Sequence, residues 1–166
     1  MQRISDRQLA TLARRVGRHL KGRRRVVATA ESCTGGWVGK ALTDIDGSSE
    51  WFVEGFITYG NEAKIKTLGV PRSVLRRHGA VSEAAARAMA RGALRRAKAD
   101  LSVAVTGIAG PGGAVPGKPV GTVWFAWAVR DGRRVRLTMQ LELFRGDREA
   151  VRRAAVRVAL RGLLAR

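Results

Sequence analysis

The chain has 166 residues, 45% of them hydrophobic, which is enough apolar material for the core of one domain covering residues 1–166. No apolar run approaches the about 20 residues of a membrane helix. The N-terminus also lacks the apolar segment of a signal peptide, so we expect no contact with a membrane. The single cysteine, Cys33, excludes an internal disulfide and favours a cytoplasmic location.

The net charge of +19 is typical of proteins that bind nucleic acids, but its distribution argues against that function. Residues 1–25 carry nine basic side chains and one acidic, whereas residues 26–70 carry three basic and six acidic. The arginines fall on amphipathic flanking helices, and no aromatic residues alternate with them to form a stacking platform for bases. We therefore expect no nucleic-acid partner.

Hydrophobic spacing predicts strands and helices that alternate along the chain. Strands are expected over 26–30, 51–59, 101–105, 120–129 and 135–143. Helices are expected over 5–21, from 37 to about 43, after Asn61, from Pro71 to about His78, over 83–98 and after Asp147. Ser5 or Asp6, Asn61, Ser82 and Asp147 have the side chains expected of N-caps.

Helices between the strands imply βαβ crossovers, and Asp131-Gly132 predicts a hairpin that adds an antiparallel edge. The predicted fold class is α/β, a three-layer α/β/α sandwich with a mixed, mostly parallel sheet. In such sheets ligands collect beyond the carboxyl ends of the strands. Three loops would converge there: residues 28–36, residues 59–61 and residues 106–113.

The first of these loops, residues 28–36, has the character of a nucleophile on a turn between a strand and a helix. Two hydroxyls and a thiol stand side by side in Ser32, Cys33 and Thr34. Gly35 and Gly36 allow positive φ and a close approach of the backbone to a ligand. Free N–H groups at the start of the next helix favour an anion or oxyanion above the turn.

Other kinds of site find no support in the sequence. His19 and His78 are isolated, so neither a zinc site nor a Ser-His-Asp triad assembles. The turn lacks the Gly-Lys-Ser/Thr ending of a P-loop. We expect no metal ion and no organic cofactor.

A base for Ser32 must then be something other than histidine, and Lys64 is the candidate. A lysine base must be neutral, and its ordinary pKa of about 10.4 has to fall to about 7–8. The apolar neighbours Ala63, Ile65 and Leu68 make burial of the amine reasonable. Cys33 is a rival nucleophile: a strand continuing to residue 33 would put Glu31 and Cys33 on one face, as in a Cys-Lys-Glu amidase site.

Five segments together resemble the CinA C-terminal family, whose stand-alone members are nicotinamide-nucleotide amidases. The segments are AESCTGG (30–36), YGNEAK (59–64), GAVSE (79–83), TGIAGP (106–111) and KPVGTV (118–123). The resemblance runs in order from about residue 26 to 148. It implies an α/β/α sandwich, a homo-oligomer, and conversion of nicotinamide mononucleotide to nicotinate mononucleotide and ammonia.

The resemblance also implies roles for individual residues. Ser32 would be the nucleophile and Lys64 the base, with Tyr59 and Thr106 supporting the pair or the substrate. The oxyanion would be held by the N–H groups of Cys33 or Thr34. The remaining residues expected to bind the nucleotide are Gly35, Gly36, Asn61, Gly107, Gly110 and either Arg145 or Arg148 for the phosphate.

Two other functions stay open on the sequence alone. Membership of a family does not guarantee activity, so the chain could be a catalytically silent domain that binds a nucleotide or a partner. A DNA-associated role is the other, and a steep salt dependence of DNA binding would support it.

Overall fold

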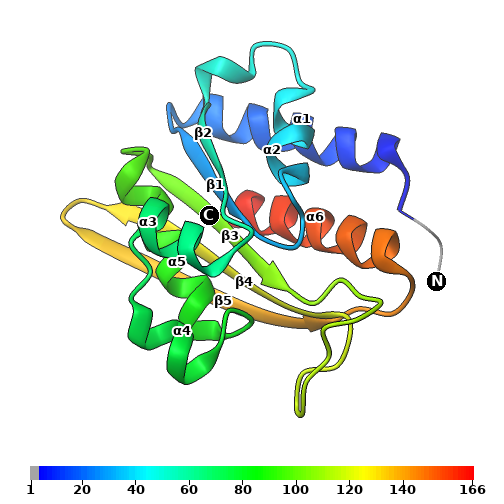
Figure 1. Cartoon of the computed structure of the whole chain (residues 1–166). Coiled ribbons are helices and arrows are strands. Elements are labelled where there is room, and N and C mark those ends of the chain that lie inside the picture. Colours follow the sequence, from blue (N-terminus) through cyan, green and yellow to red (C-terminus); the bar gives the residue numbers. More distant parts are fainter. Residues whose placement is uncertain (1–3) are drawn as a thin grey trace.

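Figure 1 shows the computed structural model of the protein, which describes residues 4–166; residues 1–3 of the predicted domain lie outside this range. Its centre is a five-stranded sheet in the order β2-β1-β3-β4-β5. β1 pairs in parallel with β2 and β3, while β4 runs antiparallel to β3 and β5. The predicted mixed sheet is confirmed. The strands are β1 (Val27–Glu31), β2 (Phe52–Ile57), β3 (Leu101–Gly107), β4 (Thr122–Asp131) and β5 (Arg134–Leu143).

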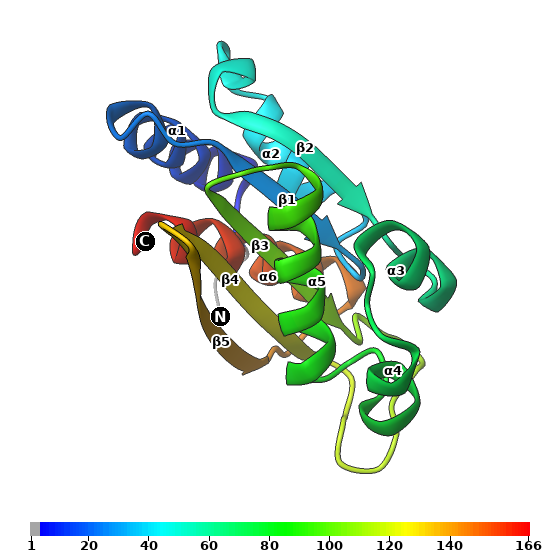
Figure 2. The same cartoon turned by 90° about the vertical axis from the view of Figure 1, so that its left-hand side faces the viewer.

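Helices cover both faces of the sheet, as Figures 1 and 2 show. α1, α2 and α6 lie on one face, and α5 lies on the other, with α3 and α4 beside it. The predicted three-layer sandwich is therefore confirmed. The helices are α1 (Asp6–Gly22), α2 (Trp37–Thr43), α3 (Asn61–Leu68), α4 (Arg72–His78), α5 (Glu83–Arg96) and α6 (Arg148–Leu164), with a 3₁₀ turn, η1 (Ser48–Glu50).

Three of the expected caps are confirmed and one is wrong. Ser5 forms a capping box at the start of α1, and Ser82 and Asp147 accept from backbone N–H groups of α5 and α6. Asn61 is instead the first helical residue of α3, and no side chain caps this helix. The N-cap is Gly60, which has the extended backbone typical of an N-cap (φ −81°, ψ 160°). The helix therefore begins one residue earlier than predicted.

The two faces of the sheet differ in side-chain size. Large side chains such as Val103, Phe125 and Trp127 pack toward α1, α2 and α6. Alanines of β1, β3 and β4 face α5, which contributes its own row of alanines. Small side chains on both partners let α5 lie close to the sheet. This close packing fixes the loops that leave the sheet at the carboxyl ends of β1 and β3.

The edge strand β5 departs from the predicted alternation of buried and wet faces. Val135, Leu137 and Met139 pack against the α5 side as expected. Leu141 and Leu143 are 51% and 61% exposed, because the helices leave the last part of this edge strand uncovered.

Among residues 4–166, no helix has the length and apolar character needed to cross a bilayer. The expected homo-oligomer stays a prediction.

Gly92 of α5 sets how closely this helix approaches α3. A Cβ at position 92 would lie 2.2 Å from the carbonyl oxygen of Leu68, at the end of α3. We expect Gly92→Ala to push the two helices apart and to lower the free energy of unfolding by about 1–3 kcal/mol. Urea unfolding measures this change. Gly22→Ala is the control, since nothing lies within 4 Å of a Cβ there; equal losses in both variants would contradict the prediction.

Candidate active site

The candidate site begins where β1 ends. Because side chains alternate along a strand, Glu31 and Ser32 point to opposite faces of the sheet. The Ser32 N–H donates to the carbonyl oxygen of Val105 on β3 (2.9 Å), and the Gly35 N–H donates back to the Ser32 carbonyl (3.0 Å). These two hydrogen bonds hold the chain in a tight turn that begins at Ser32.

Glu31 stabilises this turn from the face of the sheet opposite Ser32. Its carboxylate is 1% exposed and accepts hydrogen bonds from the N–H groups of Gly36 (3.1 Å), Val38 (2.9 Å) and Gly39 (2.8 Å). The carboxylate thereby satisfies N–H groups that α2 leaves unpaired at its start. Glu31 is thus engaged with α2, on the face opposite Ser32, and does not form the Cys-Lys-Glu arrangement considered from the sequence.

We expect Glu31→Gln to destabilise the protein by about 2–3 kcal/mol, because an amide cannot accept all three of these charge-assisted bonds. Thermal unfolding followed by circular dichroism measures the loss. Glu62→Gln is the matched control: Glu62 pairs with Arg72 at the exposed surface, and its loss should leave the unfolding midpoint unchanged. A midpoint for Glu31→Gln equal to that of the control would contradict the anchoring role.

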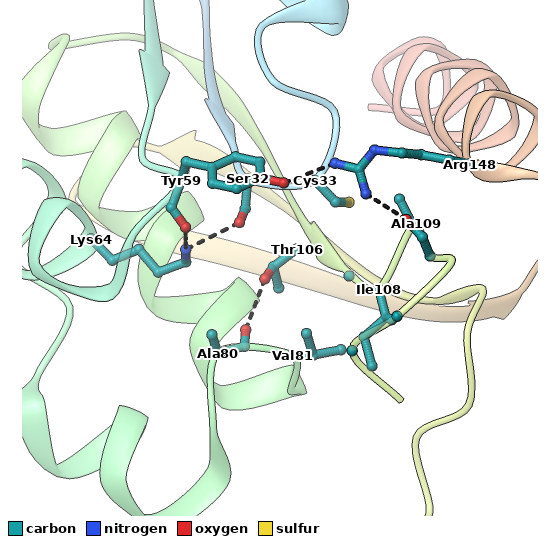
Figure 3. Close-up of a pocket in the computed structure, with 14 residues that line it drawn as sticks. Ser32, Cys33, Tyr59, Lys64, Ala80, Val81, Thr106, Ile108, Ala109 and Arg148 are labelled. Carbon is teal, nitrogen blue, oxygen red and sulfur yellow. Dashed lines mark hydrogen bonds between the residues drawn. The ribbon is translucent and has the colours of Figure 1, made fainter. Parts of the chain in front are cut away.

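Lys64 approaches Ser32 from α3, one turn after that helix begins (Figure 3). Its side chain is 1% exposed. The Nζ atom lies 3.1 Å from Ser32 Oγ, 2.8 Å from the carbonyl oxygen of Thr58 and 3.0 Å from that of Tyr59. In the described part of the chain, no carboxylate forms an ion pair with this amine. The predicted pair of Ser32 and Lys64 is therefore in contact.

Burial lowers the pKa of Lys64 from its ordinary value, and the neighbouring Cys33 opposes this shift. The surroundings also suit a neutral amine. A neutral amine has two N–H donors and one lone pair. Two of its three neighbours are carbonyls, which can only accept, and the third is the Ser32 hydroxyl, which can donate. The arrangement can thus take the proton of Ser32 Oγ.

Cys33, the rival nucleophile, has a different environment. The thiol is 5% exposed, and burial raises its pKa to about 12. It therefore stays protonated at neutral pH, and a protonated thiol is a poor nucleophile. The amine of Lys64 hydrogen-bonds Ser32, not Cys33. Both features favour Ser32 as the attacking group.

Arg148, the first residue of α6, contacts both of the other loops predicted to meet at the site, residues 59–61 and residues 106–113. Its guanidinium donates to the carbonyl oxygen of Gly110 (2.6 Å) and to the hydroxyl of Tyr59 (2.9 Å). Tyr59 thus contributes its carbonyl to Lys64 and its phenol to Arg148 (Figure 3). Thr106 also lies at the site, and its hydroxyl donates to the carbonyl oxygen of Ala80 (2.8 Å).

A cavity of about 250 Å³ opens between these loops. Seven of the residues predicted for the site line it: Ser32, Cys33, Tyr59, Lys64, Thr106, Gly107 and Gly110. Arg148 lines it as well, whereas Arg145 lines a separate cavity between β5 and α6. Gly35 and Gly36 line a neighbouring cavity, Thr34 is fully buried, and Asn61 is exposed at the start of α3.

Several lining residues carried no chemical signal in the sequence. Ala80 and Val81 come from the segment before α5, and Ile108 and Ala109 follow β3. Apolar side chains of this kind shape a cavity without reacting. Two signals pointed to them: the order of loops around a parallel sheet, and their place in the family-like segments GAVSE (79–83) and TGIAGP (106–111). Within residues 4–166, no three His, Cys, Asp or Glu side chains gather where they could hold a metal ion.

Comparison with known proteins identifies the family. A sequence profile described as the CinA C-terminal domain matches residues 9–166. The chain belongs to the CinA C-terminal domain family. Among the relatives, a protein of Escherichia coli (strain K12) is 52% identical over 96% of this chain and 95% of its own length. It is named nicotinamide-nucleotide amidohydrolase PncC, as is a relative of Pseudomonas putida with 51% identity over 94% and 95% of the two chains.

Solved structures of CinA proteins share the fold. The competence/damage inducible protein CihA from Agrobacterium tumefaciens superimposes with a TM-score of 0.89 and is 44% identical, over 99% of this chain and 98% of that one. A competence damage-inducible protein from Klebsiella pneumoniae gives a TM-score of 0.90 at 40% identity, over 95% and 96% of the two chains. The CinA family resemblance of the five sequence segments is thereby confirmed.

Proposed function

We propose that the protein is a nicotinamide-nucleotide amidohydrolase that converts nicotinamide mononucleotide to nicotinate mononucleotide and ammonia. One observation carries the proposal: a buried lysine amine lies 3.1 Å from the hydroxyl of Ser32, with two carbonyls as its remaining partners. An amine held in this way is a general base for a hydroxyl nucleophile. The names of the relatives supply the substrate, an amide on a pyridine nucleotide.

In the first half of the proposed reaction, neutral Lys64 takes the proton of Ser32 Oγ as that oxygen attacks the carboxamide carbon. The carbonyl oxygen of the substrate becomes an oxyanion, which the backbone N–H of Cys33, the residue of the turn that lines the cavity beside Ser32, stabilises. The Lys64 ammonium then donates its proton to the amide nitrogen. The C–N bond breaks, ammonia leaves, and the acyl group remains on Ser32 as an ester.

In the second half, water attacks the ester carbon and Lys64 accepts a proton from that water. The tetrahedral intermediate collapses, the bond to Ser32 Oγ breaks, and Lys64 returns the proton to the serine oxygen. The products are nicotinate mononucleotide and the free enzyme. Each half begins with neutral Lys64, so the lowered pKa of this residue serves both steps.

The substrate phosphate is best matched by Arg148. Of the cavity-lining residues, Lys64 and Arg148 are basic, and Lys64 is occupied with Ser32. The guanidinium of Arg148 already reaches from α6 to the loop at Gly110, whose neighbours Gly112 and Gly113 also line the cavity. A planar guanidinium beside glycine N–H groups suits a phosphate. We therefore propose Arg148, and not Arg145, as the residue that binds the phosphate.

Ammonia release from nicotinamide mononucleotide tests the proposal, and its pH dependence tests the role of Lys64. Because neutral Lys64 is required, kcat/KM should rise with pH along one ascending limb, with its midpoint below the ordinary lysine value of 10.5. Cys33→Ala should keep this ascending limb, because the base is Lys64 and not the thiol. A wild-type protein that binds the nucleotide but releases no ammonia would be a silent binding domain, and a flat profile would exclude lysine as the base.

A further inference from the structure

The cavity between the end of β5 and the second half of α6 is separate from the candidate active site. Its volume is about 690 Å³, within the range of sites that hold small-molecule ligands. The two cavities have no lining residue in common. Four of the eleven residues that line this second cavity are arginines: Arg145, Arg157, Arg161 and Arg166. We call it the arginine cavity.

The arginines of α6 differ in their contacts. Arg148, Arg152 and Arg153, near the start of the helix, all donate hydrogen bonds to other residues. In the part of the chain from residue 4 to 166, the four guanidiniums of the arginine cavity form neither a hydrogen bond nor an ion pair with another residue. Their donors are therefore available to a ligand.

Two of these guanidiniums are in an unfavourable environment. Arg157 and Arg166 are half-buried, and their Nε atoms are buried without a hydrogen-bond partner in the described residues. Burial lowers the pKa of Arg166 from its ordinary value. Its guanidinium stacks over the ring of Trp127, 5.0 Å from the centroid, a contact that supplies no acceptor. Because buried donors are nearly always paired in proteins, an anion that accepts from these groups would stabilise the cavity.

The charge of the lining indicates what kind of anion fits. Glu142 of β5 is the one acidic side chain among the described lining residues, and its carboxylate accepts a hydrogen bond from Gln140 (2.6 Å). Four arginines and one glutamate give the lining a net charge of +3. A di- or triphosphate group concentrates several negative charges in a small volume. Guanidinium forks match the oxygens of such a group, because each can bind two of them at once.

We propose that the arginine cavity binds a di- or triphosphate group, either as inorganic pyrophosphate or as part of a nucleotide. Leu143 and the half-buried ring of Phe144 add an apolar edge against which the base of a nucleotide packs. A nucleic-acid backbone spreads its phosphates along an extended line. The four guanidiniums instead surround one hollow, which favours a compact polyanion over DNA.

Calorimetric titration of the protein with inorganic pyrophosphate, at fixed ionic strength in a phosphate-free buffer, tests the proposal. We expect Arg161→Gln to raise Kd about 10- to 100-fold, as loss of a charge-assisted hydrogen bond does. Arg157→Lys should also raise Kd, because an ammonium keeps the charge but loses the fork. Arg91→Gln is the matched control: Arg91 is an exposed arginine of α5 outside the cavity, so Kd should stay within about twofold.

Further titrations identify the ligand and the place where it binds. AMP, with a single phosphate, should bind more weakly than pyrophosphate. Tighter binding of ATP than of pyrophosphate would assign the cavity to a nucleotide, and equal binding would assign it to the phosphate chain alone. Arg148→Gln should bind pyrophosphate as the wild type does, because Arg148 lines the active-site cavity and not this one.

Four results would overturn the proposal. The first is no binding of pyrophosphate at millimolar concentration, and the second is AMP binding as tightly as pyrophosphate. The third is equal losses in Arg161→Gln and Arg91→Gln, which would mean that diffuse charge attracts the anion. The fourth is a loss in Arg148→Gln alone, or a DNA duplex that pyrophosphate does not displace. Each readout is binding and not ammonia release, so the proposal can fail or succeed independently of the proposed amidohydrolase function.

Discussion

Replacing Ser32 with alanine is expected to lower kcat for ammonia release by at least about 10³-fold, because the acyl-enzyme can no longer form. The fold should survive, since the Ser32 backbone keeps its hydrogen bonds to Val105 and Gly35. Substrate binding should also persist, because the proposed phosphate contact is made by Arg148 and not by the Ser32 hydroxyl. A coupled assay for ammonia and a binding titration with nicotinamide mononucleotide measure the two effects separately.

Cys33→Ala is the natural control for this experiment, since Cys33 lines the same cavity next to Ser32. The thiol is protonated at neutral pH because burial raises its pKa to about 12. We therefore expect Cys33→Ala to keep kcat within about threefold of the wild type, in line with a residue that does not react. The reverse result, an active Ser32→Ala and an inactive Cys33→Ala, would assign the chemistry to the thiol.

Replacing Lys64 with methionine should have an effect of similar size, about 10³-fold on kcat, because Ser32 loses the group that takes its proton. Methionine keeps most of the apolar stem and supplies no base. Lys64→Arg should not restore activity, since a guanidinium stays charged over the whole working range of pH. Single-turnover measurement of ammonia release checks both variants. Wild-type activity in Lys64→Arg would show that the residue acts as a charge and not as a base.

The lowered pKa of Lys64 should also change how the free energy of unfolding depends on pH. At pH values below its folded-state pKa, the folded protein bears the full cost of a buried ammonium. That cost falls as the pH rises from the folded-state pKa toward 10.5, because the folded state releases its proton before the unfolded chain does. The wild type should therefore gain stability relative to Lys64→Met over this range. Urea unfolding of both proteins across that range shows the sign.

The contact between Ser32 and Lys64 could be predicted from the sequence because both residues lie close to the ends of predicted strands. A short strand, two glycines and a hydroxyl at Ser32 mark the turn, and the period of a strand sends Ser32 and Glu31 to opposite faces. Lys64 follows the next strand by a few residues, so the topology of a parallel sheet brings it to the same edge. Apolar neighbours made the burial of Lys64 reasonable, but its extent depends on how α3 packs, and only the structure shows that the side chain is 1% exposed.

The arginines show where sequence reasoning stops. Arg145, Arg148 and Arg152 look alike in a basic segment, and which of them faces the cavity depends on where α6 begins and how it is rotated against the sheet. Arg148 lines the site cavity and Arg152 donates to the backbone after Ser32, whereas Arg145 precedes the helix and lines a different cavity. The exposure of Leu143 could not be predicted from the sequence either, because it depends on which helices cover the edge strand β5.

The most direct test of the central claim is the identity of the acylated atom. The wild-type protein is mixed with nicotinamide mononucleotide, quenched in acid within one turnover and digested with trypsin, which releases residues 26–40 as one peptide. Mass spectrometric fragmentation between Ser32 and Cys33 locates the nicotinate ribotide group. We predict an ester on Ser32 that is absent in Lys64→Met. An adduct on Cys33, or ammonia release with no adduct on this peptide at any time, would contradict the account.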